Sequence, residues 1–301
     1  MRRFFVPSQD IDDETAYIRG SDVRHIRDVL RLREGDMVAV VDGAGNEYQC
    51  RIKHLAGDLV ECQMLERVRR AGEPSIKITL VQGLPKGDKM DYVVQKGTEV
   101  GIGRFVPVIT ERTVVRLAAG GPGDGREETG KIEKRTARWR RIAMEAAKQA
   151  GRSIVPIVER PRCLDDAVDV LSGERRGERG DYRDCGDRCD RGPGSPDVDA
   201  DSDGDAGGPG AGSTPGVGAM WLVPWELETA RPLKGVLKGR PDAREFVVFI
   251  GPEGGFTSDE IQMLVAHGAV SVTLGPRIFR TETAGLVVAA AVLYEYGELG
   301  G

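Results

Sequence analysis

Apolar and polar positions along the first seventy or so residues predict a small β-rich unit. Short apolar stretches predict strands at 37–41, 47–53 and 59–65, with the loop Asp42-Gly43-Ala44-Gly45-Asn46 joining the first two as a hairpin. A short helix precedes them, with apolar residues at near-helical spacing from Val23 to Leu32 and Ser21 or Asp22 as its N-cap. We expect these strands to complete a small barrel.

Beyond a turn at 71–74 the pattern changes to alternating strands and helices, which is typical of an α/β sheet. We expect strands at 76–82, 105–110, 154–158, 220–223, 246–250 and 270–274, and helices at 89–100, 131–150, 258–267 and 281–296. Thr257 and Glu260 have the spacing of a capping box that starts the helix at 258. The chain therefore divides into a β-rich unit, 1–72, and an α/β domain, 74–301.

One stretch of the α/β domain does not follow this pattern. Residues 173–218 are rich in Gly, Asp, Arg and Pro and contain one aromatic residue. Such a composition buries too little apolar surface to offset the entropy of ordering. We expect a disordered insertion there, with the α/β domain continuing on both sides.

The location of charge matters more than its total. The formal net charge is -5, but the insertion alone holds eleven Asp and Glu against six Arg. Residues 131–152 hold eight Lys and Arg against two Glu. The body of the protein is therefore neutral and carries one basic patch, which is compatible with binding nucleic acid.

Membrane and metal classes have little support. No stretch approaches the roughly 20 apolar residues that span a bilayer, and the N-terminus lacks a secretory signal, so we expect a cytoplasmic protein without membrane contact. Cys185 and Cys189 are close in sequence but have no histidine nearby, so we expect no metal.

Three strand ends in the last third of the chain indicate a ligand site. Residues 223–226, 251–255 and 275–277 each follow a short apolar strand and contain residues that bend the backbone sharply. Ligands of open α/β sheets bind at such carboxyl ends. The glycines match neither the dinucleotide fingerprint nor the P-loop, which favours a ligand without phosphates, although a tight turn without a ligand is an equally good interpretation of any single loop.

The start of the last helix carries the charged residues that are closest to these loops. Thr281 is expected as its N-cap, with Glu282 in the first turn, where an anion complements the helix dipole. Arg280 lies between a buried strand and a buried helix, so we do not expect it to be ordinary solvated surface.

The segments Gly251-Pro252-Glu253-Gly254-Gly255-Phe256 and 274–284 (LGPRIFRTETA) resemble the signature of the SPOUT methyltransferases of the RsmE type. The opening RFFVP, the segment HIRDVLR, the runs KGDKMD and QKGTEVG, and QAGR at 149–152 fit the same family in order. The resemblance covers nearly the whole chain except the insertion. Two departures are the insertion itself and the absence of a cysteine that relatives often have near residue 150.

The resemblance implies a fold, a cofactor and an assembly. Residues 1–72 would form a PUA-like β-barrel, and 74–301 a SPOUT α/β domain with a deep trefoil knot, a rare exception to unknotted topology. The cofactor would be S-adenosyl-L-methionine, bound in the knot of a homodimer. By resemblance, its binding residues are Leu222, Pro224, Trp225, Glu226, Ile250, Gly251, Pro252, Gly254, Gly255, Leu274, Gly275, Arg277, Ile278, Thr281, Thr283 and Ala284.

The family's reaction is methylation of N3 of uridine 1498 in the 16S rRNA of the assembled small (30S) ribosomal subunit. N3 lies on the Watson-Crick edge, so the base must be unpaired, and it must lose a proton to attack the methyl group. We expect Arg280 to stabilise the negative charge that develops on the base, and Glu282 or Glu253 to accept or orient the proton.

Six arginines are expected to contact RNA phosphates, which supply affinity rather than sequence choice. They are Arg3, Arg27, Arg31, Arg138, Arg141 and Arg152. Each alone is also compatible with ordinary surface charge. Two other functions stay open: a SPOUT methyltransferase acting on another RNA atom, such as a ribose 2'-hydroxyl of tRNA, and a non-catalytic RNA-binding or ribosome-assembly factor that keeps the fold.

Overall fold

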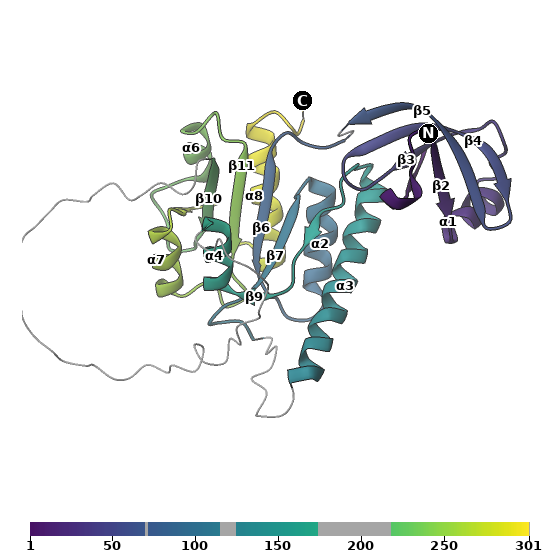
Figure 1. The fold of residues 1–301 in the computed structure, drawn as a ribbon. Helices are drawn as coiled ribbons and strands as arrows, with labels where there is room; N and C mark the ends of the chain where they lie inside the picture. Colours follow the sequence, from purple (N-terminus) through teal and green to yellow (C-terminus); the bar gives the residue numbers. More distant parts are fainter. Residues whose placement is uncertain (70–71, 115–124, 174–217, 301) are drawn as a thin grey trace, which may run out of the picture.

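The computed structural model describes residues 1–69, 72–114, 125–173 and 218–300, which form two separate sheets (Figure 1). The N-terminal sheet has the strand order β1-β3-β4-β5-β2. Its strands are β1 (Arg2–Phe5), β2 (Thr15–Arg19), β3 (Met37–Val41), β4 (Asn46–Ala56) and β5 (Leu59–Arg69). The expected hairpin of β3 and β4 is confirmed as an antiparallel pair. Strand β4 also pairs antiparallel with β5, and both extend further than the sequence predicts. Alternate residues of these strands pack into one apolar core.

The short helix of the N-terminal unit is confirmed, but its expected cap is wrong. Between β1 and β3 lie the short helices η1 (Ser8–Asp10), α1 (Ser21–Arg24) and η2 (His25–Val29), the last with π-helical geometry. The N-cap of α1 is Gly20, at φ 72°, with no side-chain hydrogen bond. Ser21 and Asp22 therefore lie inside the helix, because glycine makes the left-handed turn that precedes it.

The second sheet is parallel throughout, as the alternation of strands and helices predicts. Its order is β12-β10-β11-β6-β7-β8, and β9 also pairs with β7. The strands are β6 (Lys77–Gly83), β7 (Arg104–Ile109), β8 (Ile157–Val158), β9 (Arg162–Cys163), β10 (Ala219–Pro224), β11 (Glu245–Ile250) and β12 (Val270–Val272). The chain thus forms a mixed α/β fold with a separate β-rich unit.

Helices cover both faces of the parallel sheet (Figure 1). They are α2 (Lys89–Val100), α3 (Gly125–Ala150), α4 (Leu164–Ser172), α6 (Leu233–Lys238), α7 (Ser258–Ala266) and α8 (Thr281–Glu295). Leu222 and Val248 point to the core beneath α2 and α8, whereas Trp221 and Phe249 point to the core beneath α4 and α7. This alternation follows from the two-residue period of a strand.

The expected strand at 154–158 is wrong over its first three residues. Only Ile157 and Val158 form β8. The backbone N–H groups of Ser153 and Ile154 instead donate to the Glu73 carboxylate, and that of Val155 donates to the Gly43 carbonyl. These bonds, with a bridge between Ala44 and Ile154, dock the N-terminal unit on the α/β domain.

The expected insertion at 173–218 lies outside the described residues except for its two ends, so the structure does not test it. Across the described ranges, none of the helices combines the length and the apolar composition that crossing a membrane requires.

Candidate active site

The three strand ends that the sequence singled out lie at one edge of the sheet. Strand β10 is flanked by β11 and β12, and all three run parallel, so their carboxyl ends are neighbours. A backbone hydrogen bond of 3.1 Å from Trp225 to the Val272 carbonyl ties the turn after β10 to β12. Topology therefore brings together the loops that follow Pro224, Ile250 and Val272.

The glycine loop, residues 251–255, has no room for side chains at its glycines. A Cβ on Gly251 would lie 2.9 Å from the backbone of Gly255. Gly255 has φ +69°, and a Cβ there would lie 3.1 Å from the carboxylate of Glu226. Arg112 holds the loop from outside, because its Nη1 donates to the Gly254 carbonyl at 3.0 Å. The turn is therefore compact and keeps its backbone near the surface.

The start of α8 is bonded directly to this loop. Arg280 is the N-cap, and its side chain makes no cap hydrogen bond, so the expectation that Thr281 caps the helix is wrong. The Thr281 hydroxyl instead donates to the Gly251 carbonyl at 2.6 Å and accepts from Gln82 Nε2 at 2.9 Å. Gln82 is fully buried, and its Oε1 has no hydrogen-bond partner among the described residues.

A cluster of four charged side chains lies beside the hydrogen bonds that join Gln82, Thr281 and Gly251. Lys89 Nζ is 2.8 Å from Glu253 Oε1 and 3.5 Å from Glu282 Oε2. Arg280 Nη1 is 4.0 Å from Glu282 Oε1. The three predicted catalytic residues are therefore brought together, and Lys89 at the start of α2 connects two of them.

Arg280 is exposed, contrary to the expectation from its place in the sequence. Its side chain is 83% exposed, because the segment 275–280 lies on the surface rather than between the layers. Ile278 in the same segment is 90% exposed, which is unusual for an isoleucine. An exposed cation and an exposed apolar side chain leave this segment open to a large ligand.

The pKa values of Glu253 and Lys89 show how this cluster is charged. Partial burial acts to raise the pKa of Glu253, but the hydrogen bonds from Lys89 Nζ and from the Lys86 backbone outweigh it, and the net shift is downward. The hydrogen bond to Glu253 raises the pKa of Lys89. Both groups are thus ionised near neutral pH, and Glu253 is a weak base.

The residues expected to bind the cofactor contribute in different ways. The side chains of Leu222 and Ile250 are buried in the sheet core, so these residues can offer only backbone groups. Gly275 has φ +96°, and a Cβ there would meet no atom within 4 Å, so its backbone borders open space. Ile278 adds exposed apolar surface, as does Leu227, which was not among the expected residues. This set fits S-adenosyl-L-methionine, which has a flat aromatic adenine that can pack on apolar side chains and carries no phosphate.

The six arginines expected to contact RNA are not equivalent. The side chain of Arg152 is 5% exposed, pairs with Glu73 at 2.7 Å and donates to two backbone carbonyls, so its expected phosphate contact is wrong. Arg3 pairs with Glu47 at 2.9 Å and donates to the Gly151 carbonyl. These two side chains hold elements of the protein together.

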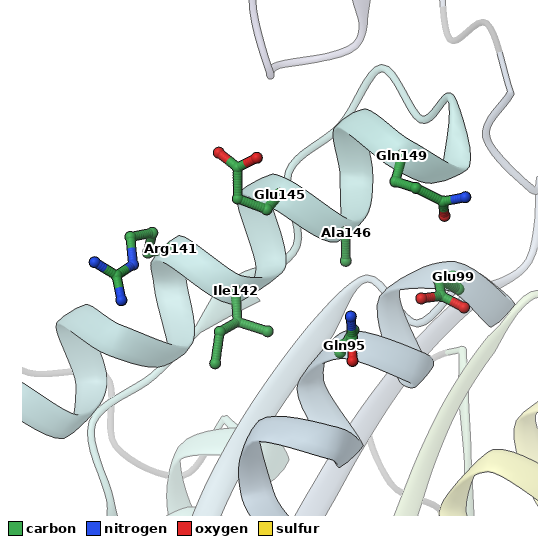
Figure 2. Close-up of a pocket in the computed structure, with 7 residues that line it drawn as sticks. All are labelled: Gln95, Glu99, Arg141, Ile142, Glu145, Ala146 and Gln149. Carbon is green, nitrogen blue, oxygen red and sulfur yellow. The ribbon is translucent and has the colours of Figure 1, made fainter. Parts of the chain in front are cut away.

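The other four arginines are exposed. Arg27 pairs with Asp28 at 2.8 Å, and Arg138 pairs with Asp91. Within the described ranges, no carboxylate lies at ion-pair distance from Arg31 or Arg141. Arg141 lines a groove between α2 and α3, whose floor includes Ile142 and Ala146 (Figure 2).

Sequence reasoning missed three residues of the site: Gln82, Lys89 and Arg112. Lys89 stands in one of the family-like runs, but its carboxylate partners lie 164 or more positions away in the chain. The signal available for Gln82 was a polar residue at the end of an otherwise apolar predicted strand, and the structure shows that it is buried. As for metals, the structure shows no cluster of His, Cys, Asp and Glu suited to one in its described parts.

Known proteins match the chain over nearly its full length. A family model described as RNA methyltransferase domain matches residues 72–176 and 218–293, and one described as RNA methyltransferase PUA domain matches residues 18–65. Ribosomal RNA small subunit methyltransferase E of Bacillus subtilis is 30% identical over 299 residues, which cover 98% of this chain and 97% of that protein. The Synechocystis protein of that name is 28% identical over 96% of this chain.

A solved structure of similar sequence agrees with the fold. The structure titled as ribosomal RNA small subunit methyltransferase E from Neisseria gonorrhoeae bound to S-adenosyl methionine has a TM-score of 0.70 and 28% identity, and the match covers 98% of both chains. The family resemblance of the sequence is confirmed. The chain belongs to the RNA methyltransferase family, among the relatives named ribosomal RNA small subunit methyltransferase E.

Proposed function

We propose that this protein methylates N3 of uridine 1498 in the 16S rRNA of the small ribosomal subunit, with S-adenosyl-L-methionine as the methyl donor. The observation that carries the proposal is the hydrogen bond from Thr281 to Gly251, which places the Arg280–Glu282 segment directly against the glycine loop. The residues for binding a donor and for handling charge on a base thus share one edge of the sheet.

The cofactor supplies an electrophilic methyl group on a sulfonium centre. In our proposal the backbone of the loops that follow β10, β11 and β12 binds the cofactor, with Leu227 and Ile278 beside its adenine. The compact glycine loop keeps those backbone groups within reach of a ligand, because a Cβ on Gly251 or Gly255 would crowd the turn.

Transfer to N3 requires the uracil to lose a proton and to carry negative charge on its flanking carbonyl oxygens. Arg280, which is exposed beside the site, stabilises that charge electrostatically. Glu282 accepts or orients the proton, since one of its oxygens makes no hydrogen bond in the described structure. Glu253 is less suited to that role, because two donors already occupy its carboxylate and its pKa is lowered.

The proposal includes the assembly that the family implies. Residues 1–72 act as a PUA-like RNA-binding domain, 74–301 form the SPOUT domain with a trefoil knot, and two copies form a homodimer in the cytoplasm. Arg31 and Arg141 are the arginines best placed to contact phosphates, because both are exposed and no described carboxylate pairs with them.

The test maps modified uridines in 16S rRNA by mass spectrometry in a strain that lacks the gene. We expect one N3-methyluridine, at position 1498, to disappear, and the purified protein with S-adenosyl-L-methionine to restore it on 30S subunits from that strain. If position 1498 keeps its methyl group, the substrate assignment is wrong. Methylation of a ribose 2'-hydroxyl of tRNA by the purified protein would support the other enzyme function.

A further inference from the structure

Among the described residues, Lys89 is the side chain that contacts both carboxylates of the site. Its Nζ lies 2.8 Å from Glu253 Oε1 and 3.5 Å from Glu282 Oε2. The three residues come from the start of α2, the glycine loop and the first turn of α8. Lys89 therefore joins three segments that are far apart in the chain at the edge where the loops meet.

The two carboxylates differ in how fully their hydrogen-bonding capacity is used. Glu253 accepts from Lys89 Nζ and from the Lys86 backbone at 3.1 Å. Glu282 is only 14% exposed, its Oε2 makes no hydrogen bond among the described residues, and its Oε1 has Arg280 at 4.0 Å. A buried carboxylate oxygen without a donor is costly unless a nearby cation compensates it, and Lys89 is that cation.

The charges around the site also indicate that Lys89 compensates the two carboxylates. Lys89 and Arg280 offset Glu253 and Glu282, and the Lys86 backbone N–H also donates to Glu253. On α2, Asp91 is paired with Arg138 of α3, and Asp88 lies 3.7 Å from the same guanidinium. Without Lys89, Glu253 would lose its ion-pair partner, and Glu282 would keep only the exposed Arg280 at 4.0 Å.

From this geometry we infer that Lys89 is a positioning residue for methyl transfer: it holds Glu253 of the glycine loop against the start of α2 and fixes Glu282 as the carboxylate that meets the substrate. The inference rests on the proposed function for its substrate. Lys89 itself need not touch the base. Its effect passes through Glu282, so the two residues must act as a coupled pair.

The experiment compares K89Q, K89R, E282Q and K89Q/E282Q in methylation of 30S subunits, with cofactor affinity measured by calorimetry. We expect K89Q to lower kcat about tenfold, less than the roughly 100- to 10,000-fold contribution of a general acid or base itself, with little change in the KM for S-adenosyl-L-methionine. K89R should recover most of the rate. The double variant should be no slower than E282Q, because the coupling is already absent in E282Q.

K77Q is the matched control, because Lys77 of β6 and Glu245 of β11 form an ion pair of 2.5 Å at the ends of these strands that lie away from the glycine loop. It should retain the wild-type rate. The acid limb of the pH-rate profile should move to higher pH in K89Q, since a cation beside two carboxylates is removed. Additive losses in the double variant, or a K89Q effect confined to cofactor affinity or thermal stability, would overturn the inference.

A readout without RNA separates this inference from the proposed function. Carboxyl titration by carbon NMR in the free protein should show a higher pKa for Glu253 in K89Q than in the wild type. If the wild type leaves 30S subunits unmodified but this shift is seen, the substrate proposal fails and the role of Lys89 in setting the charge of the cluster stands. An unchanged titration counts against Lys89 whatever the activity.

Discussion

The Thr281 hydroxyl is the residue-scale link between the glycine loop and α8. Thr281→Val keeps the shape but leaves the Gly251 carbonyl without its donor and removes one of the two acceptors of Gln82 Nε2, the other being the Gly83 carbonyl. Leaving buried polar groups unpaired costs about 1–3 kcal/mol each, so we expect a lower free energy of unfolding and weaker cofactor binding. Urea denaturation and calorimetry with S-adenosyl-L-methionine measure the two effects.

Thr283→Val is the matched control for that change. Thr283 lies in the same helical turn and is half-buried, and no hydrogen bond of its hydroxyl is found in the described structure. We expect the free energy of unfolding of this variant to stay close to that of the wild type. Equal losses of stability in the two variants would mean that the Thr281 hydroxyl does not link the loop to the helix.

Arg152 gives the second residue-scale prediction. Arg152→Met should lower the free energy of unfolding by about 3–5 kcal/mol, because it leaves the Glu73 carboxylate buried without its cation. Arg141→Met, at an exposed position in the groove of Figure 2, should change stability little. Thermal and urea unfolding of both variants provide the comparison, and similar stabilities would contradict a structural role for Arg152.

The sequence could not distinguish these two arginines, and the reason is physical. Both belong to a basic run whose net charge is plain from the sequence, but burial depends on Glu73, 79 positions away. Charge density along a chain predicts a basic surface only when no distant carboxylate folds back on it. The same limitation hid Lys89, whose partners follow β11 and begin α8.

At the scale of elements, local signals were the most reliable. The capping box of Thr257 and Glu260 was predicted from a three-residue spacing, and the structure has both of its hydrogen bonds, at 3.2 and 2.8 Å. The limits of α2 were predicted as observed. The N-cap of α8 was misplaced by one residue, because Thr281 uses its hydroxyl in a contact with Gly251 that local sequence does not reveal.

Thr257→Ala tests the capping box. Removing the acceptor for the Glu260 N–H should cost about 1 kcal/mol and fray the start of α7, next to the glycine loop. Ser258→Ala is the control, since Ser258 is the exposed first residue of the same helix. Amide hydrogen exchange over residues 256–262 should rise in Thr257→Ala alone. Equal exchange in both variants would show that the box contributes little.

At the scale of the whole molecule, RNA binding should draw on exposed arginines of both sheets. Arg31 follows the helices of the N-terminal unit and Arg141 lies on α3, and each is exposed with no described carboxylate at ion-pair distance. Binding affinity falls as salt concentration rises, and the plot of log affinity against log salt becomes shallower by about 0.7–0.9 for each phosphate that the protein no longer neutralises. Arg31→Gln/Arg141→Gln should therefore lower the slope by about one to two in titrations of 30S subunits.

The two exposed arginines that form ion pairs in the free protein should contribute less to the salt dependence of RNA binding. Arg27→Gln and Arg138→Gln should change the slope less, because Asp28 and Asp91 already neutralise those guanidinium groups in the free protein. A phosphate would have to displace a carboxylate at either position, which reduces the number of counterions released. If Arg27→Gln lowers the slope as much as Arg141→Gln does, the RNA surface includes the ion-paired arginines, and pairing in the free protein is no guide to it.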